Sequence, residues 1–237
     1  MMKRGLVLSG GTARTNLELA CRAEHAGFDS VFAVEFFNKS AYAVLGAIAA
    51  ATERVTIGSG IANAFTRSPV LHASCAMDLD ELSGGRMVLG LGSGTRRMNE
   101  QWYGVPFSRP ASRMSEVVGV VRALMAAREG LGFDFEGEFF DLHIPAYQRP
   151  AAVRASMPIW LAGVNRPMVR TAGRVADGLV GHPIATRRWH REVSLPTLRA
   201  AEEQAGRPEA ACPLYPYLLC VLDEDRERAM REAKQQI

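Results

Sequence analysis

The chain has 237 residues, a formal net charge of +3 and a hydrophobic content of 48%. This length suffices for one large domain with a substantial core, and so small and dispersed a charge argues against nucleic-acid binding. No apolar run approaches the ~20 residues that a membrane-spanning helix needs, and the amino terminus lacks a signal-peptide core. We therefore expect a cytoplasmic protein with neither nucleic acid nor membrane as a partner.

Strand and helix patterns alternate along the first half of the chain. We expect strands at residues 3–9, 30–35, 55–62 and 87–92, and helices at 16–26, 41–51 and 69–83. Thr15 is the expected N-cap of the first helix, with Glu18 three residues later and Gly27 at the C′ position. Ser68 and Pro69 provide an N-cap and a first-turn proline for the third helix.

The second half begins with an excursion at residues 95–158, which contains a helix near 112–128 and an aromatic segment at 133–140. Strands are then expected at 158–163, 178–182 and 215–222, and helices at 167–176, 189–205 and 225–236. Strictly alternating strands and helices indicate parallel strands with right-handed crossovers. Both an open doubly wound sheet and a (β/α)8 barrel fit this order, and seven strands are one short of a closed barrel.

Two of the expected strands end in glycine-rich turns, at residues 55–63 and 87–94. Their carboxyl ends carry few side chains, so a flat or phosphorylated ligand could lie against the backbone. Gly92, Ser93 and Gly94 could form an anion nest, and the turn at 162–167 leads into a helix amino terminus where Arg166 suits a phosphate. The alternative is that the glycines only permit tight turns. The dinucleotide fingerprint G-x-G-x-x-G is absent from the first turn.

Ligands bind outside the carboxyl ends of parallel strands, which sorts the remaining polar residues. This face is expected to hold Glu35, Asn63, Ser93, Thr95, Asn165, His182 and Asp223. His182 suits a neutral-pH acid or base, or a simple hydrogen-bonding role. Glu35 lies beside two phenylalanines, which would raise its pKa unless solvent reaches it. Arg86 and Asp177 precede strands, so we expect structural ion-pair or capping roles for them.

For the remaining histidines, arginines and cysteines, we expect roles in the structure and not in chemistry. We expect surface positions for the histidines on helices, His25, His72 and His190, and a solvated helix face for Arg187, Arg188 and Arg191. The cysteines have no metal-ligand spacing and are expected to be small buried hydrophobes without a metal: Cys21, Cys75, Cys212 and Cys220. A set of aromatics could line an apolar pocket or belong to the core: Phe36, Phe37, Phe65, Trp102 and Tyr103.

The segment Leu-Asp-Glu-Leu-Ser-Gly-Gly-Arg-Met-Val-Leu-Gly-Leu-Gly-Ser-Gly at 79–94 resembles the signature of the bacterial-luciferase-like monooxygenase family. Residues 58–69 resemble the third-strand end of its coenzyme F420-dependent branch, which includes methylenetetrahydromethanopterin reductase. Further matches at 23–30, 158–163 and 172–183 extend the resemblance over nearly the whole chain. The resemblance implies a single-domain TIM barrel over 1–237, with an insertion at 95–158 after strand four and without its eighth βα unit.

The resemblance also implies a non-prolyl cis peptide at Gly60–Ile61, bulging toward one face of a cofactor ring. The implied cofactor-binding residues are Gly60, Ile61, Ala62, Asn63, Gly92, Ser93, Gly94, Ala162, Gly163, Asn165 and Arg166. His182 and Glu35 are the catalytic candidates for proton transfer, although many relatives carry aspartate or histidine at the position of Glu35.

Family membership would make the protein an oxidoreductase that transfers hydride between coenzyme F420 and an unidentified organic substrate. A two-component monooxygenase using FMN and a non-catalytic flavin-binding protein are the alternatives. A homodimer is expected from the family alone.

Overall fold

The computed structural model describes residues 3–127, 129–149, 153–154 and 156–235. Its main sheet is parallel and has the strand order β1-β2-β3-β5-β8-β9-β10, with the short β4 also paired to β5. The strands are β1 Gly5–Leu8, β2 Ser30–Ala33, β3 Thr56–Ser59, β4 Ala62–Asn63, β5 Met87–Gly92, β8 Ile159–Ala162, β9 Gly178–Val180 and β10 Leu214–Tyr215.

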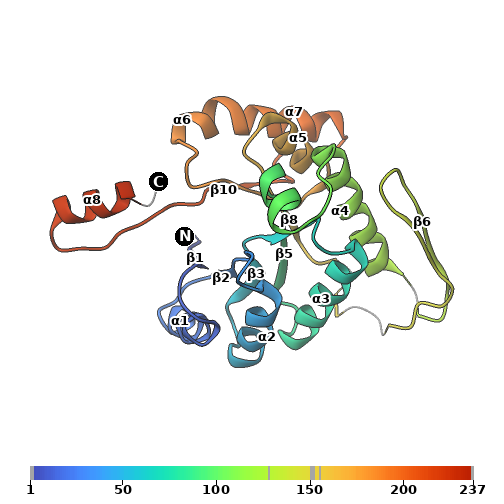
Figure 1. Cartoon of the computed structure of the whole chain (residues 1–237), viewed down its shortest axis with the longest axis horizontal. Helices are drawn as coiled ribbons and strands as arrows, with labels where there is room; N and C mark the ends of the chain where they lie inside the picture. Colours follow the sequence, from blue (N-terminus) through green and yellow to red (C-terminus); the bar gives the residue numbers. More distant parts are fainter. Residues whose placement is uncertain (1–2, 128, 150–152, 155, 236–237) are drawn as a thin grey trace.

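Six helices surround the curled sheet: α1 Ala13–His25, α2 Ala41–Ala51, α3 Pro69–Leu82, α4 Pro110–Ala126, α5 Arg166–Val175 and α7 Leu195–Gln204. Figure 1 shows the strands meeting near the centre with these helices outside them. Within the described residues, β1 and β10 end the strand order and do not pair with each other. The protein therefore has the predicted α/β barrel architecture, in an open and incomplete form.

The core lies on both faces of the central strand. All six residues of β5 are buried, and Ile57, Leu89 and Leu161 on three neighbouring strands have no exposed surface. A strand buried on both faces must be apolar throughout, which explains its uninterrupted run of methionine, valine, leucine and glycine. This rigid centre fixes the carboxyl ends of β3, β4 and β5, where the site lies.

The excursion after β5 contains a π-helical turn, η1, at Met98–Trp102, followed by α4. It then forms an antiparallel hairpin of β6 Phe133–Glu136 and β7 Asp141–Ile144, which projects at the right of Figure 1. The hairpin accounts for the aromatic segment in the sequence, because Phe133 turns its ring into the core.

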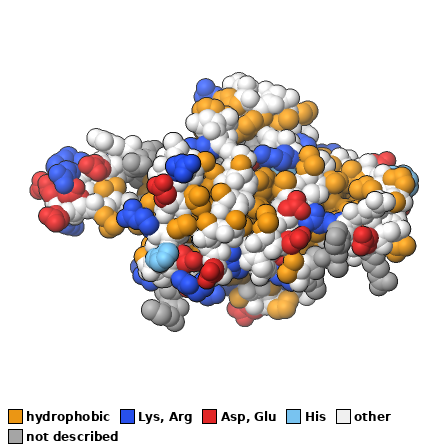
Figure 2. All heavy atoms as spheres, turned by 90° about the horizontal axis from the view of Figure 1, so that it is seen from below, with side chains coloured by type: hydrophobic (Ala, Val, Ile, Leu, Met, Phe, Trp, Pro, Cys, Tyr) orange, Lys and Arg blue, Asp and Glu red, His pale blue; other side chains and the backbone are white. Residues whose placement is uncertain are grey.

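The predicted strand at 215–222 is wrong beyond Tyr215. Only Leu214 and Tyr215 pair with β9; Pro216 has no N–H to donate, and no strand flanks the following residues in the described structure. Leu218 and Leu222 are consequently 75% and 96% exposed. The next helix, α8 at Arg226–Gln235, stands apart at the left of Figure 1 and carries interleaved acidic and basic side chains in Figure 2.

Several local predictions differ from the structure in their bounds. The first helix begins at Ala13, because the Thr12 hydroxyl accepts the Thr15 N–H at 3.2 Å, so Thr12 is the N-cap and Thr15 is not. The helix predicted at 189–205 begins earlier, as α6 Arg187–Trp189, and continues through η2 His190–Ser194 into α7. Gly27, with φ of 77°, and the Ser68–Pro69 cap are confirmed.

Two predictions of exposure are corrected by the structure. His72 has no exposed surface, since it lies on the same inward stripe of α3 as Ala76 and Leu79. Cys212 is buried as predicted, but Cys21 and Cys75 are half-buried and Cys220 is exposed on the unpaired segment after β10. The three arginines of α6 and η2 are exposed as predicted. No helix in the described part of the chain has the length and apolarity to cross a membrane.

Candidate functional site

The carboxyl ends of β2, β3 and β5 are joined by the segment that follows β3. The Gly60 N–H donates to the Ala33 carbonyl at 2.8 Å, and the Glu35 N–H donates to the Ile61 carbonyl at 3.2 Å. On the other side, the Ala64 N–H donates to the Gly92 carbonyl at 2.9 Å. The Gly60–Ile61 peptide is cis, as predicted. The backbone is therefore held from both neighbouring strands across the cis bond.

Gly60, directly after β3, and the glycines of β5 have close neighbours inside the protein. A Cβ at Gly60 would lie 2.8 Å from the Phe32 Cβ, and one at Gly90 would lie 1.9 Å from the Ser59 carbonyl oxygen. A Cβ at Gly92 would lie 2.6 Å from the Ile61 Cδ1. Close packing thus requires a glycine at position 90, where the neighbour is backbone, whereas at position 92 the neighbour is the end of the Ile61 side chain.

In the turn after β5, the backbone carbonyls are hydrogen-bonded within the described structure and the backbone N–H groups are not. Asn99 donates from Nδ2 to the carbonyls of Ser93 and Thr95, both at 2.8 Å, and the Ser93 hydroxyl donates to the Gly94 carbonyl at 3.1 Å. By contrast, the described structure provides no acceptor for the N–H groups of Ser93, Gly94 and Thr95. These residues are half-buried or exposed. A turn with satisfied carbonyls and unpaired N–H groups suits an anion.

Two buried amides flank this turn. Asn63 is 3% exposed and Asn99 has no exposed surface. A Cβ at Gly94 would lie 2.9 Å from the Asn63 Nδ2 and 3.0 Å from the Asn99 Nδ2, so only glycine fits there, with its φ of 63°. Among the described residues, the Asn63 Nδ2 and the Asn99 Oδ1 have no hydrogen-bond partner. The Asn63 and Asn99 side chains that contact this turn can therefore each form a further hydrogen bond.

Glu35 lies at the centre of a buried polar cluster. Its Oε1 accepts hydrogen bonds from the Asn63 N–H at 3.1 Å and from the Arg67 Nη1 at 2.6 Å. The Glu35 side chain is 6% exposed, and its Oε2 is buried without a partner in the described structure. The carboxylate therefore fixes the carboxyl end of β4, and its second oxygen has unused hydrogen-bonding capacity among the described residues.

The cluster continues into α2 and α3. The Arg67 guanidinium lies 5.1 Å from the centroid of the Tyr42 ring, and the Tyr42 hydroxyl pairs with the His72 Nδ1 at 2.6 Å. Burial lowers the pKa of His72 to about 4 and raises the pKa of Tyr42. The hydrogen bond to Glu35 raises the pKa of Arg67. Near neutral pH the cluster thus contains a neutral imidazole beside one buried ion pair.

His182 follows β9 and is exposed, on the face where the sequence predicts it. The Ile184 N–H donates to its Nδ1 at 3.3 Å. In the neutral ring, this bond places the remaining proton on Nε2, which can donate to a ligand.

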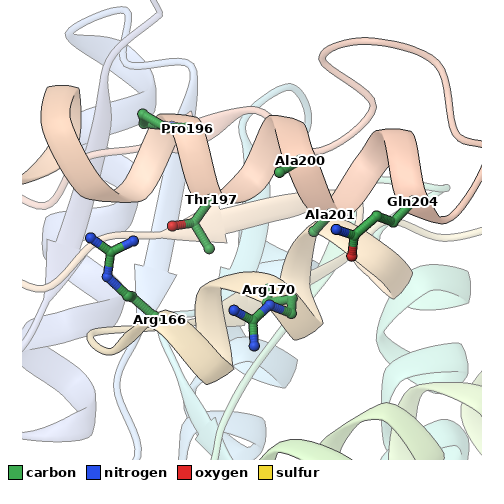
Figure 3. Close-up of a pocket in the computed structure, with 7 residues that line it drawn as sticks. All are labelled: Arg166, Arg170, Pro196, Thr197, Ala200, Ala201 and Gln204. Carbon is green, nitrogen blue, oxygen red and sulfur yellow. The ribbon is translucent and has the colours of Figure 1, made fainter.

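The turn between β8 and α5 has a different arrangement from the turn after β5. The Gly163 N–H donates to the Val180 carbonyl at 3.3 Å, and the Asn165 side chain caps α5 by accepting from the Met168 N–H at 3.0 Å. Arg166 lines a groove of about 230 Å³ between α5 and α7, together with Arg170 (Figure 3). The Arg166 side chain therefore lies in a groove between outer helices.

Aromatic residues divide between the rim and the core. Phe36, Phe37 and Trp102 are exposed and contact one another, with ring centroids 4.8 to 5.7 Å apart. Phe65 is buried and packs on Phe107, so of the five predicted lining residues it belongs to the core. An apolar rim from the β2–α2 loop and η1 thus stands beside the polar cluster.

Residues predicted on the opposite face have the structural roles expected of them. Arg86 donates to the carbonyls of Ala49 and Thr52 at the carboxyl end of α2, and Asp177 pairs with Arg122 at 2.8 Å. Asp223, in contrast, lies beyond the sheet and pairs with Arg228, because the strand that would have positioned it does not form.

Sequence reasoning missed Arg67, Tyr42 and Asn99. Arg67 stands within the quoted 58–69 segment, and the presence of a carboxylate at a neighbouring strand end could have suggested an ion pair. Asn99 gives no comparable signal, since its role depends on the π-helical turn that brings it back over the turn after β5.

Comparison with known proteins identifies relatives along the whole chain. Residues 3–237 match the family described as luciferase-like monooxygenase. A putative coenzyme F420-dependent oxidoreductase of Mycobacterium tuberculosis is 39% identical over 190 residues, which cover 75% of this chain and 54% of that protein. A 5,10-methylenetetrahydromethanopterin reductase of Archaeoglobus fulgidus is 29% identical over 216 residues, covering 90% of this chain and 61% of that protein.

A solved structure gives the same result for the fold. The coenzyme F420-dependent tetrahydromethanopterin reductase from Methanopyrus kandleri superposes with a TM-score of 0.87 at 26% identity, covering 98% of this chain and 70% of that one. The chain spans less than two thirds of the length of the curated relatives it matches, 58% in one mycobacterial case.

Proposed function

The chain belongs to the luciferase-like monooxygenase family, and we propose that it is an oxidoreductase that exchanges hydride between coenzyme F420 and an organic substrate. The F420-dependent relatives named above support this choice of cofactor. When bound, the deazaflavin would supply a two-electron hydride carrier, which reacts poorly with oxygen.

The observation that carries the proposal is the turn after β5. Among the described residues, three consecutive N–H groups have no protein acceptor, those of Ser93, Gly94 and Thr95. They follow the end of β5, which pairs with β4 just after the cis peptide at Gly60–Ile61. The Glu35 Oε2 and the Asn63 Nδ2, both buried and without a hydrogen-bond partner in the described part of the chain, lie at the same edge. Such a collection of unused donors and acceptors fits a large polar cofactor with an anionic part.

The proposed cofactor site has two walls. Gly60, Ile61, Ala62 and Asn63 would support the ring. Its polar and phosphate-bearing parts would be held by the turn after β5, at Gly92, Ser93 and Gly94. Ala162, Gly163, Asn165 and Arg166 of the turn after β8 would extend this wall, although the Gly163 N–H already donates to the Val180 carbonyl.

Proton handling is assigned to His182 and Glu35. His182 is exposed at the end of β9 with a donor at Nε2, so it can hydrogen-bond a cofactor or substrate oxygen. Glu35 keeps one carboxylate oxygen fixed on Arg67 and Asn63, which orients the other oxygen. Phe36, Phe37 and Trp102 would exclude water from one side and contact an apolar part of the substrate.

Fluorescence titration of the purified protein with coenzyme F420 and with FMN tests the choice of cofactor. We expect F420 to bind at least about tenfold more tightly than FMN, and its bound reduced form to persist in air. Preferential binding of FMN, with rapid oxidation of the reduced complex by oxygen, would instead identify a flavin-dependent monooxygenase. Binding without turnover of any reductant or acceptor would favour a flavin-binding protein.

A further inference from the structure

Asn99 makes an unusual set of contacts for a side chain outside the predicted site. Its Nδ2 donates to two carbonyls, those of Ser93 and Thr95, and its own N–H donates to the same Thr95 carbonyl at 3.1 Å. Asn99 has no exposed surface, so water does not compete for these hydrogen bonds. A single amide thus ties both ends of the Ser93–Thr95 turn.

In the turn at residues 92–95, every backbone carbonyl accepts a hydrogen bond from a protein donor. The Gly92 carbonyl accepts from Ala64, and the Gly94 carbonyl accepts from the Ser93 hydroxyl. With the two carbonyls bound by Asn99, four successive carbonyls are occupied. The N–H groups of Ser93, Gly94 and Thr95 have no acceptor in the described structure.

We infer that Asn99 is a positioning residue that makes this turn a receptor for an anionic oxygen group. Without its Nδ2, the Ser93 carbonyl would have no protein donor and could rotate toward the ligand, where its negative end would repel an anion. The buried Asn63 Nδ2, which has no hydrogen-bond partner among the residues that the structure describes, is adjacent to Gly94 and strengthens the positive character of the same turn. The inference rests on the proposed function only for the identity of the anion.

Two sources of such a group are compatible with this chemistry: the phosphate of a bound cofactor and a carboxylate of the substrate. Paired ligands separate them. Riboflavin is FMN without its phosphate, and the corresponding phosphate-free deazaflavin is available from F420. The ratio of the two dissociation constants in the flavin pair measures the contribution of the phosphate, because FMN and riboflavin differ only in that group, and a substitution that acts through the phosphate reduces this ratio.

The test compares wild type with Asn99→Leu, which removes the donors, and Asn99→Asp, which keeps the shape and the acceptor oxygens. Gln101→Ala, an exposed change on the same π-helical turn, is the control. We expect both Asn99 variants to reduce the phosphate-dependent ratio by about tenfold while leaving binding of the phosphate-free ligands within about twofold. An undiminished ratio in a folded Asn99 variant would exclude the phosphate as the group that this turn binds, and together with amides that do not respond to succinate it would overturn the inference.

A second measurement uses the unaltered protein and so does not depend on whether the variants fold. Inorganic phosphate and succinate are titrated separately into 15N-labelled protein. Shifts of the Ser93, Gly94 and Thr95 amides with phosphate identify a phosphate receptor, and shifts with succinate alone identify a carboxylate receptor. Shifts confined to Arg166–Met168, or none, would contradict the inference. If F420 fails to exchange hydride while these amides respond, the proposed function fails and the role of Asn99 stands.

Discussion

The Glu35 carboxylate and the Arg67 guanidinium approach to 2.6 Å across 32 positions of the chain and join the end of β2 to the start of α3. The same Glu35 oxygen accepts the Asn63 N–H, so the ion pair and the backbone of β4 share one acceptor. The 60–67 segment is therefore held in place by a charged side chain from a neighbouring strand.

Replacing Arg67 with methionine should leave Glu35 as a buried carboxylate without its ion-pair partner, stabilised only by the hydrogen bond from the Asn63 N–H. Removing one partner from a buried pair costs about 3 kcal/mol of unfolding free energy, toward the lower end because Arg67 is 28% exposed. Urea unfolding of Arg67→Met at pH 7 measures the change. The matched control is Arg96→Met, which breaks an exposed pair with Glu100 and should cost under about 0.5 kcal/mol. Equal losses in the two variants would show that the Glu35 pair has no special importance.

Gly94→Ala should destabilise the protein more than Gly84→Ala. Both residues have positive φ, 63° and 65°, so both variants carry the left-handed penalty of about 1 kcal/mol. A Cβ at Gly84 meets nothing within 4 Å, whereas one at Gly94 meets the amides of Asn63 and Asn99. We expect an additional loss of about 1 kcal/mol at Gly94 in urea unfolding. Equal urea midpoints for the two variants would mean that the Asn63 and Asn99 side chains move to make room for a methyl group at no cost in stability.

Acid should destabilise the protein through His72. Its pKa is lowered by burial to about 4 in the folded state, from an ordinary value of 6.5, so below pH 6.5 the unfolded state binds the extra proton. Stability should fall by about 1.4 kcal/mol per pH unit between these limits. His72→Gln should remove this slope and leave the contribution of the carboxyl groups. Parallel pH profiles for wild type and variant, by urea unfolding, would contradict a buried neutral His72.

Arg86→Lys should destabilise the protein although it conserves the charge. The Arg86 guanidinium donates to the carbonyls of Ala49, Thr52 and Val55 at 2.6 to 3.1 Å, a spread that one ammonium group cannot cover. We expect a loss of about 2 kcal/mol in urea unfolding. Arg54→Lys, at an exposed neighbouring position, is the control and should change stability little. If Arg86→Lys unfolds at the same urea concentration as the wild type, one ammonium group is enough to stabilise these carbonyls.

The sequence predicted correctly those helices and strands whose apolar residues match the positions that are buried in the fold. The helix at 41–51 and the strand at 87–92 have the bounds that the sequence predicts, because each is apolar and ends at an unambiguous cap or glycine. The predicted strand at 215–222 failed because its partner β9 ends at Val180, so no strand in the described structure pairs with the residues after Tyr215, and the pattern of apolar residues carries no information about a missing neighbour.

At the site, the backbone features were easier to predict than the side-chain network. The cis peptide at Gly60–Ile61 followed from resemblance to the family, and the polarity of the turn after β5 agrees with the expected anion nest. The pairing of Tyr42 with His72 could not be predicted, because it depends on how α2 packs against α3. Long-range contacts of this kind leave no periodic signal in either helix.

Titration of 15N-labelled protein with coenzyme F420 tests the central claim most directly. If this edge of the barrel binds the deazaflavin, the amides of Gly60, Ile61, Ser93 and Gly94 should shift together with one dissociation constant, while those of Gly84 and Gly206 should not respond. Shifts at the groove between α5 and α7 instead, or the absence of any saturable shift, would contradict the account.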